Sequence, residues 1–462
     1  MTSTKFENGL FIFRRDFRII DNNGLNLLNE YCKNIYTIFV FTPEQIGSGN
    51  KYKSDNAVQF MIESLKDLAS QISKSGGRLY TFYGHNDKVV TDCINAFDAE
   101  IVCFNEDITP YAKERDDKIS QICEKLDVFV LKTHDYYLHQ PGTIVNGSGQ
   151  VYQKFTPYYE TAMKKKVEAP AAKRKLSLES KDASIPNKIS LDDALHKFTE
   201  VNPNILVHGG RPEAIKVLKS AIKSQAHYSK THNDLSKQTT MLSAYIKFGC
   251  ISVREVYKAL HGKPDIIRQL FWRDFYAGIL YSFPRVLGHA LKPKYDKLKW
   301  HHNERWFKAW CNGETGFPIV DAGMRQLNQC GYMHNRARLI VASFLTKTLL
   351  IHWRKGEEYF ASKLTDYDVA SNNGNWQWVA SSGADSQPFF RIFNPWEQTK
   401  NYDPECSYIK TWIPELKDVP VKDIFNWETK YTEYKDTKYP KPICNYKEQK
   451  EMTIKMYKEA LY

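Results

Sequence analysis

The hydrophobic pattern of this chain changes once along its length, and that change constrains the fold more than any other feature. Over residues 9–131, short apolar runs rich in β-branched and aromatic residues alternate with segments of helical spacing, as at 57–72 and 89–97. Such alternation predicts a parallel sheet with crossover helices. The expected strands lie at 10–13, 35–41, 79–83, 101–104 and 128–131.

Beyond about residue 202 the apolar residues recur every three or four positions, as at 337–351, which predicts helices. We therefore predict a doubly wound α/β domain over residues 1–135 and an all-α domain over residues 202–462, joined by a linker at 136–201. Residues 163–188 are rich in lysine, alanine, serine and proline, so we expect them to be exposed. The cluster Lys173, Arg174 and Lys175 suits a solvated linker, although a nuclear import signal or a DNA-facing patch would carry the same charges.

The composition indicates a soluble protein with an anionic partner. The chain has 462 residues, 42% of them hydrophobic, enough for two buried cores. Its nine cysteines include no CxxC pair, so neither a zinc or iron–sulfur site nor a disulfide framework is indicated. No stretch approaches the ~20 apolar residues of a spanning helix, and we expect a monomer that is intracellular, cytoplasmic or nuclear, and not secreted.

The basic balance points to nucleic acid. Lysine and arginine number 65 against 53 aspartates and glutamates, a net charge of +12, although a solvated lysine-rich surface would give the same balance. Aromatic residues make up 14% of the chain and would serve as stacking surfaces for bases or a flat cofactor, or as core. After the first expected strand come Arg14, Arg15, Asp16 and Arg18 where a dinucleotide-binding turn would have GxGxxG, so that fingerprint is absent.

One dense run in the second half, LTDYDVASNNGNWQW at residues 364–378, combines carboxylates, amides and two tryptophans. Its two aspartates alone would suit a metal, and its Asn-Asn-Gly alone would suit a turn. Neither interpretation explains the tryptophans. Flat rings beside polar groups suit a ring system with many polar edges.

This run resembles the flavin-binding signature of the photolyase/cryptochrome family. Other segments resemble the family in the same order, and they cover nearly the whole chain apart from the linker. They are FIFRRDFRIIDNNGL, KQTTMLSAYIKFG, RQLFWRDFY, GFPIVDAGMRQLNQCGYMHNRARLIVASFL, WRKGEEYF and FFRIFNPWEQTKNYDPECSYIKTWIPEL.

The resemblance implies that the helical domain binds FAD folded into a U. Hydroxyls and N–H groups at the start of the TTMLS helix would hold the pyrophosphate, although an ordinary helix cap is the alternative for that stretch alone. Arg338 would pair with Asp366 and keep it ionised beside the flavin ring. The expected cofactor-binding residues are Tyr228, Thr239, Thr240, Met241, Leu242, Ser243, Arg273, Arg338, Asp366, Asp368 and Asn372.

By the same resemblance, Asn372 faces flavin N5. An amide does not readily give a proton to the reduced anionic flavin that repair needs. Plant-type cryptochromes carry an aspartate there, so Asn372 favours repair over signalling, with a structural asparagine in a turn as the alternative. Trp376, Trp353 and Trp300 match the family's electron-transfer chain, whereas without the resemblance they read as core.

The resemblance also implies UV-damaged DNA as the partner. A poorly stacked pyrimidine dimer would flip into a cavity beside the flavin, and an electron from the excited reduced flavin would open it without a metal or an acid–base pair. Asn372, Gln269 and Asn335 are the expected catalytic residues. The expected lesion- and phosphate-binding residues are Gln269, Trp272, Arg273, Asn335, Arg336, Leu339, Trp378, Arg391 and Gln398.

Three residues depart from the pattern of cyclobutane-dimer photolyases. Gln269 stands where these enzymes usually have a glutamate, as it does in (6-4) photolyases and animal cryptochromes. Asn335 stands where the (6-4) branch has the first of two histidines for proton transfer, and His334 alone does not reproduce that pair. Leu339 replaces a frequent methionine at similar volume. We expect cyclobutane repair, with (6-4) repair as the alternative.

The two remaining alternatives are a cryptochrome without repair activity and a flavin-free nucleic-acid-binding protein. Only about 40 residues follow WIPELKDVPVKDIF, and they are not of low complexity, which counts against signalling. An antenna chromophore would lie near Asn105, Glu106, Asp107 and Pro110. Its identity stays open between methenyltetrahydrofolate, a deazaflavin and none.

Overall fold

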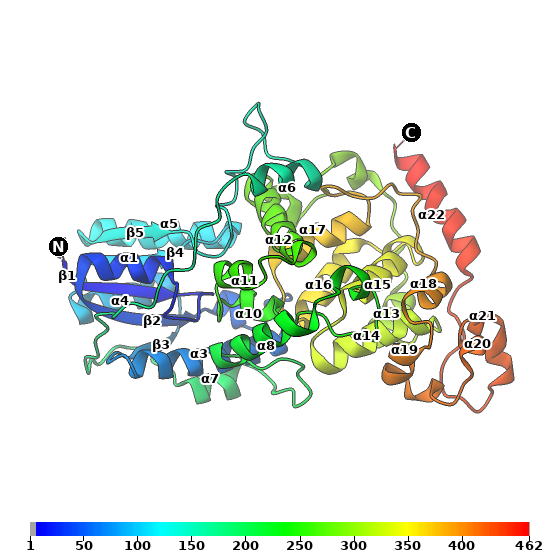
Figure 1. The fold of residues 1–462 in the computed structure, drawn as a ribbon, viewed down its shortest axis with the longest axis horizontal. Coiled ribbons are helices and arrows are strands. Elements are labelled where there is room, and N and C mark those ends of the chain that lie inside the picture. Colours follow the sequence, from blue (N-terminus) through cyan, green and yellow to red (C-terminus); the bar gives the residue numbers. More distant parts are fainter. Residues whose placement is uncertain (1–5, 462) are drawn as a thin grey trace.

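The computed structural model describes residues 6–461. Its amino-terminal part is a parallel sheet of five strands in the order β3-β2-β1-β4-β5 (Figure 1), which confirms the predicted doubly wound domain. The strands are β1 Phe6–Phe13, β2 Cys32–Phe41, β3 Leu79–Tyr83, β4 Ile101–Asn105 and β5 Phe129–Thr133. The helices around them are α1 Asn23–Tyr31, α2 Pro43–Ile46, α3 Asp55–Ser73, α4 Asn86–Phe97 and α5 Pro110–Lys125.

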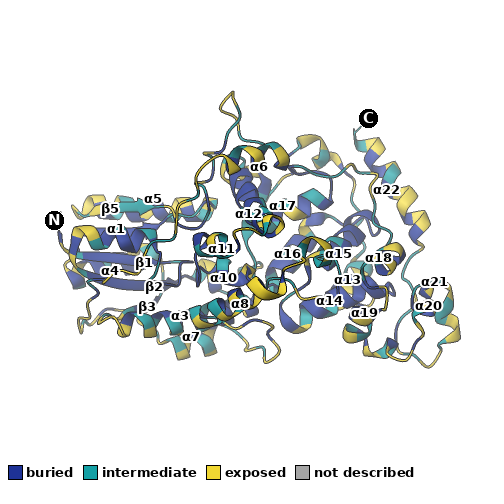
Figure 2. Cartoon of the chain, in the orientation of Figure 1, coloured by how far each residue is buried: buried dark blue, intermediate teal, exposed yellow. Residues whose placement is uncertain are grey.

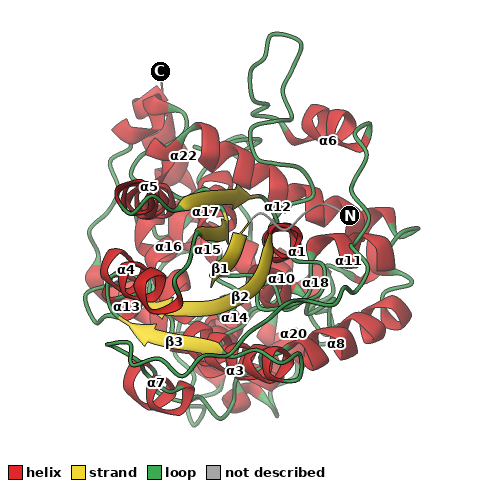
Figure 3. Ribbon diagram, turned by 90° about the vertical axis from the view of Figure 1, so that its left-hand side faces the viewer, coloured by secondary structure: helices red, strands yellow, loops and turns green. Residues whose placement is uncertain are grey.

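Both faces of the sheet are covered. Phe11 and Phe13 of β1 belong to one apolar cluster with residues of α1 and α3, whereas Leu10 and Ile12 belong to another with residues of α4 and α5. This alternation follows from the two-residue period of a strand. Figure 3 views the molecule from the side of the sheet domain, with helices around the strands.

The connection between the domains is less exposed than its composition suggests. It contains α6 Phe155–Met163 and α7 Leu191–Phe198. Leu176, Leu178 and Ile185 are buried, so the expectation of an exposed segment over 163–188 is wrong at these positions. The backbone also joins the sheet domain, because Ile35 N–H donates to the carbonyl of Ser177 at 2.8 Å. Buried aliphatic side chains and backbone hydrogen bonds together attach this otherwise polar segment to the sheet domain.

The carboxyl-terminal part is helical, which confirms the predicted all-α domain. Exposed residues gather on outer helices such as α22 (Figure 2), and no helix within the described range is long and apolar enough to cross a membrane. The helices are α8 Arg211–Ser224, α9 Tyr228–Thr231, α10 Ser243–Lys247, α11 Val253–Ala259, α12 Pro264–Ser282, α13 Glu304–Asn312, α14 Pro318–Cys330, α15 Asn335–Lys347, α16 Trp353–Lys363, α17 Val369–Val379, α18 Pro395–Tyr402, α19 Ser407–Trp412, α20 Val421–Ile424, α21 Trp427–Lys430 and α22 Tyr446–Leu461, with 3-10 turns η1 Pro284–Leu287, η2 Pro293–Lys297, η3 Pro414–Leu416 and η4 Tyr431–Glu433.

The helix expected over 337–351 ends early, at Lys347. Leu350 adopts a left-handed conformation with φ of 54°, and the Ile351 N–H returns to the carbonyl of Leu345 at 3.0 Å. The apolar period continues through this turn because its side chains are also buried. The spacing of apolar residues therefore indicated which residues are buried here, and not how far the helix extends.

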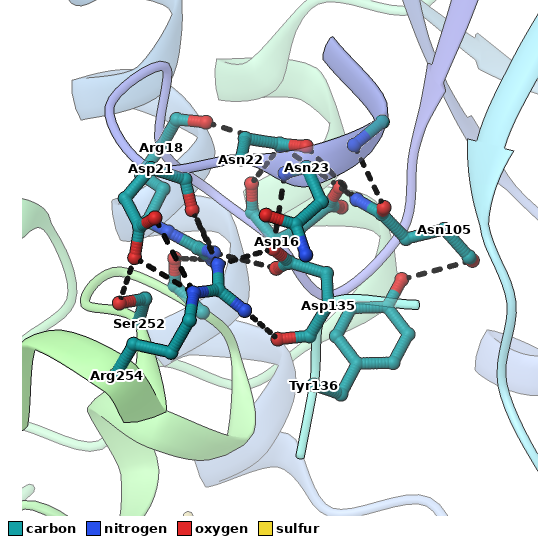
Figure 4. Close-up of polar contacts among 12 residues, drawn as sticks. Asp16, Arg18, Asp21, Asn22, Asn23, Asn105, Asp135, Tyr136, Ser252 and Arg254 are labelled. Atoms are coloured by element: carbon teal, nitrogen blue, oxygen red, sulfur yellow. Dashed lines mark hydrogen bonds and ion pairs between the residues drawn. The ribbon is translucent and has the colours of Figure 1, made fainter. Parts of the chain in front are cut away.

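A buried ionic cluster joins the two domains (Figure 4). Arg254 of α11 donates to Asp135 at 2.7 Å and to Asp21 at 3.1 Å, and Arg18 donates to Asp135 at 2.5 Å. The Ser252 hydroxyl donates to Asp21 as well. These four charged side chains are at most 4% exposed. Each buried charge therefore has an opposite partner, as burial of charge requires, and both partners of Arg254 lie across the domain boundary.

Candidate active site

Two adjoining hollows lie between α10, α12, α15 and α17. The larger has a volume of about 410 Å³ and the smaller about 100 Å³. They share a wall formed by Asn335, Arg338, Leu339, Asp366, Asp368, Ser371 and Asn375.

Most of the expected cofactor-binding residues meet at these hollows. Asn372 lines the smaller one. Thr239 and Met241 line neither, since the Thr239 hydroxyl lies 3.4 Å from that of Tyr332 and the Met241 side chain is buried. Of the expected cofactor-binding residues, those that line the larger hollow are Tyr228, Thr240, Leu242, Ser243, Arg273, Arg338, Asp366 and Asp368.

Arg338 and Asp366 form the predicted ion pair. Arg338 Nη2 lies 3.1 and 3.0 Å from the two Asp366 oxygens, and Arg338 Nε donates to the Met333 carbonyl at 2.9 Å. Burial alone would lower the pKa of Arg338, but Asp366 outweighs it and raises the pKa. A carboxylate fixed by a cation therefore faces the cavity.

Asp368 is held from the other domain. Its Oδ1 caps α17 by accepting from Ser371 N–H at 3.0 Å, and its Oδ2 accepts from Arg15 Nη1 at 3.0 Å. Burial alone would raise the pKa of Asp368, but Arg15 and Arg273 hold it well below its ordinary value. The sequence placed Arg15 in a charged loop after the first strand, but nothing in that pattern indicated a partner so far along the chain.

Arg273 provides the clearest sign that the larger hollow accepts an anion. Its Nη1 donates to the Tyr136 carbonyl at 2.6 Å and its guanidinium lies 4.6 Å from the ring centre of Tyr137. Its Nη2 is buried and has no hydrogen-bond partner among the described residues. An unpaired buried guanidinium nitrogen suits a phosphate oxygen, so the donors present fit the pyrophosphate of a dinucleotide.

Glu357 fixes the amide of Asn372, a contact that the sequence did not indicate. Asn372 Nδ2 donates to the Glu357 carbonyl at 3.0 Å, and Asn373 Nδ2 donates to Glu357 Oε1 at 2.9 Å. Glu357 Oε2 is buried without a hydrogen-bond partner in the described chain. Burial raises the pKa of Glu357 to about 7.

The expected lesion-binding residues divide into two groups. Arg336, Arg391 and Gln398 line neither hollow: Arg336 donates to Asn233 Oδ1 at 2.6 Å, and Arg391 donates to Gln387 Oε1 at 2.8 Å. The other expected lesion-binding residues line the larger hollow: Gln269, Trp272, Arg273, Asn335, Leu339 and Trp378.

Trp272 is backed by a residue of the interdomain connection. Its ring stacks on Phe155 of α6, with ring centres 3.7 Å apart and planes 5° apart. Trp378 is half-buried on α17. Both indoles therefore offer partly open flat surfaces to the larger hollow.

No histidine lines either hollow in the described residues. His334 precedes α15 and is buried, and its Nδ1 accepts from Arg336 N–H at 3.1 Å. Burial, together with Arg338 and Arg336, lowers the pKa of His334 to about 4. The imidazole is therefore neutral near pH 7.

The three expected electron-transfer tryptophans differ in depth. Trp376 is 2% exposed and Trp353 3%, whereas Trp300 is half-buried. The Trp376 ring lies so close to Gly356 of α16 that a Cβ there would be 2.1 Å from it. Trp310, which sequence reasoning did not single out, lies 6.2 Å from Trp376 between ring centres.

A separate hollow of about 490 Å³ lies at the carboxyl ends of β1 and β2, where open α/β sheets bind ligands. Asp107 and Pro110 line it, as expected. Asn105 and Glu106 do not: Asn105 Nδ2 donates to Asp16 Oδ2 at 2.6 Å, and Glu106 pairs with His134 at 3.4 Å.

This hollow in the α/β domain, which we call the sheet-edge cavity, is short of negative charge. Arg14 and Arg115 line it and share one carboxylate, that of Asp116, at 2.5 and 3.0 Å. Arg14 Nη2 and Arg115 Nη2 are buried without hydrogen-bond partners in the described part. Burial and Arg115 lower the pKa of Arg14 to about 10, so an added anion would be favoured here.

Comparisons with known proteins agree with this architecture. Residues 10–175 match the family described as DNA photolyase, and residues 266–459 match the FAD binding domain of DNA photolyase. A deoxyribodipyrimidine photo-lyase of Halobacterium salinarum is 32% identical over 98% of this chain and 99% of the relative. A (6-4)DNA photolyase of Arabidopsis thaliana is 31% identical over 96% of this chain and 87% of the relative.

Among solved structures, an archaeal photolyase from Sulfolobus tokodaii with two FAD molecules matches with a TM-score of 0.89 and 40% identity, over 98% of this chain and 100% of that chain. Fold, cavity and comparisons together define a FAD-binding flavoprotein. The chain belongs to the photolyase/cryptochrome family, and it is an enzyme, a DNA photolyase of the lyase class.

Proposed function

We propose that this protein repairs cyclobutane pyrimidine dimers in UV-damaged DNA in a light-dependent reaction. The observation that carries the proposal is that no histidine among the described residues lines the larger hollow, whereas the (6-4) branch uses two. Asn335 occupies the wall, and His334 beside it is neutral and engaged by a backbone N–H. Opening a cyclobutane ring needs electron transfer but no acid, whereas moving a hydroxyl group in a (6-4) lesion needs one.

The side chains around the hollows would hold FAD in a defined place. Bound FAD, reduced and excited by light, supplies an electron to the lesion and takes it back. Arg273 would bind the pyrophosphate through its unpaired nitrogen, and the Arg338–Asp366 pair would hold the ring system. Asn372 would be held in one orientation by the hydrogen bond from its amide nitrogen to the Glu357 carbonyl, and an amide does not readily give up a proton.

The larger hollow would receive the flipped dimer against Trp272 and Trp378. Stacking on flat rings stabilises an extruded base by roughly 1–3 kcal/mol each. Outside the hollow, exposed Arg391 would contact a flanking phosphate without reading sequence.

The decisive experiment measures repair of two defined oligonucleotides, one with a thymine cyclobutane dimer and one with a (6-4) product, under blue light after chemical reduction of the flavin. Each has a dark control. We expect repair of the cyclobutane dimer alone. Repair of the (6-4) product alone would assign the alternative that Gln269 leaves open, and repair of neither would overturn the proposal.

We also propose that the sheet-edge cavity binds a phosphate-bearing antenna chromophore. The unpaired nitrogens of Arg14 and Arg115 support an anionic ligand. The relative from Sulfolobus tokodaii is described with two FAD molecules, with the implication of a novel light-harvesting cofactor. We therefore expect a second FAD here. Denatured wild-type protein should release two FAD molecules per chain, and the Arg14→Ala variant should release one. One FAD per chain in the wild type, with no other chromophore released, would refute it.

A further inference from the structure

The half-buried His352 lies between two of the expected electron-transfer tryptophans. Its ring centre is 5.3 Å from that of Trp300 and 5.7 Å from that of Trp353. The backbone fixes this arrangement, because His301 N–H donates to the Leu350 carbonyl at 2.7 Å. The two segments that carry Trp300 and His352 are therefore paired side by side.

The hydrogen bond of His352 defines its tautomer. As the residue before α16, it accepts from Arg354 N–H through Nδ1 at 3.1 Å, so the ring proton of the neutral form is on Nε2. Burial lowers the pKa of His352 to about 4, and Arg354 and His302 act in the same direction against Asp296. The ring is uncharged at neutral pH.

We propose that His352 is a positioning residue for electron transfer, whose uncharged ring lets positive charge pass from Trp353 to Trp300. The inference rests on the proposed role of the tryptophans. One electron leaves Trp300 and fills the vacancy on oxidised Trp353, which has already replaced the electron that Trp376 gave to the photoexcited oxidised flavin. No bond breaks and no proton moves, so the net result is one electron gained by the flavin and one positive charge on Trp300.

The electrostatic consequence is large. A protonated His352 ring would lie less than 6 Å from both indole rings and would oppose a positive charge on either. At an effective dielectric constant of about 20, this lowers the population of the oxidised tryptophans by roughly a hundredfold. A neutral side chain has no such effect.

The test compares His352→Asn, which is neutral and can still cap α16, with His352→Arg, which is always charged. After a laser flash on protein with oxidised flavin, transient absorption measures the yield of long-lived oxidised tryptophan. We expect the Asn variant to stay within about twofold of wild type and the Arg variant to lose at least roughly tenfold. A wild-type yield in folded, flavin-loaded His352→Arg would overturn the proposal.

A second measurement needs no charged variant. Lowering the pH should reduce the yield in the wild type with a midpoint near the pKa of His352, about 4, but not in His352→Asn, and NMR of the labelled ring should show the same midpoint. Equal pH profiles would overturn the inference. Trp353→Phe distinguishes a failure of the inference about His352 from a failure of the tryptophan chain on which it rests. Intact light-driven flavin reduction in that variant would refute the tryptophan chain itself. Repair after chemical reduction of the flavin should be unchanged in every one of these variants.

Discussion

Glu357→Gln should change the pH dependence of stability in a direction that its burial determines. Burial raises the pKa of Glu357 from 4.5 to about 7 in the folded protein. Between these pH values the folded chain keeps a proton that the unfolded chain has lost. Unfolding therefore releases a proton, and stability falls as the pH rises through this window.

The expected loss is about 3 kcal/mol in total between pH 4.5 and pH 7, at ~1.4 kcal/mol for each pH unit. Glutamine at position 357 carries no charge at any pH and keeps an oxygen for Asn373. The variant should therefore gain about 3 kcal/mol relative to wild type on going from pH 5 to pH 8. For a domain of this size that is a relative shift of about 6–12 °C in Tm.

Thermal unfolding of the flavin-loaded protein at pH 5, 6, 7 and 8 measures this shift. Glu358→Gln is the matched control, because it removes one negative charge from the next residue of the same helix, where the side chain is only half-buried. Its pH profile should stay close to that of wild type, because the Glu358 charge contributes least to the raised pKa of Glu357. If wild type and Glu357→Gln show parallel pH profiles, Glu357 is not a buried acid with a raised pKa.

Three further results are expected. Arg254→Met should lower the free energy of unfolding by about 3–5 kcal/mol in chemical denaturation, because it leaves Asp21 without its arginine partner across the domain boundary, and Arg254→Lys should recover part of the loss. Gly356→Ala should cost about 1–3 kcal/mol in the same assay and displace the Trp376 ring, which tryptophan fluorescence would detect; an unchanged spectrum would contradict the packing. Arg391→Ala should weaken binding of undamaged and damaged DNA alike and reduce the salt slope of log K by about 1, whereas an effect on damaged DNA alone would contradict a phosphate contact.

The sequence predicted those features that depend on neighbouring residues. Apolar runs located the strands because both faces of the sheet are covered. The same reasoning failed where residues are buried outside a helix. At Leu350 the apolar periodicity of the sequence continues although the helix has already ended. It also failed for Leu178, whose burial depends on a distant strand and not on the polar residues around it.

The site was predictable only through motifs that place residues by resemblance. The pair of Arg338 and Asp366 was expected and is present. The sequence did not predict the partner of Arg15, because Asp368 lies 353 residues further along the chain and no periodicity links the two positions. The raised pKa of Glu357 is equally invisible in sequence, because it depends on how deeply the folded chain buries one carboxyl group.

Arg15 connects the sheet-edge cavity with the larger hollow of the helical domain. It lies 3.2 Å from Asp107, which lines the sheet-edge cavity, and 3.0 Å from Asp368, which lines both that cavity and the larger hollow. Lys247 lines both cavities too, and burial together with Arg15 lowers its pKa to about 8. An anion bound in either cavity would therefore act on the same cations, so binding at one site would change the affinity of the other. The ionic cluster around Arg254 joins the same two domains, because its charges cannot separate without loss of their partners.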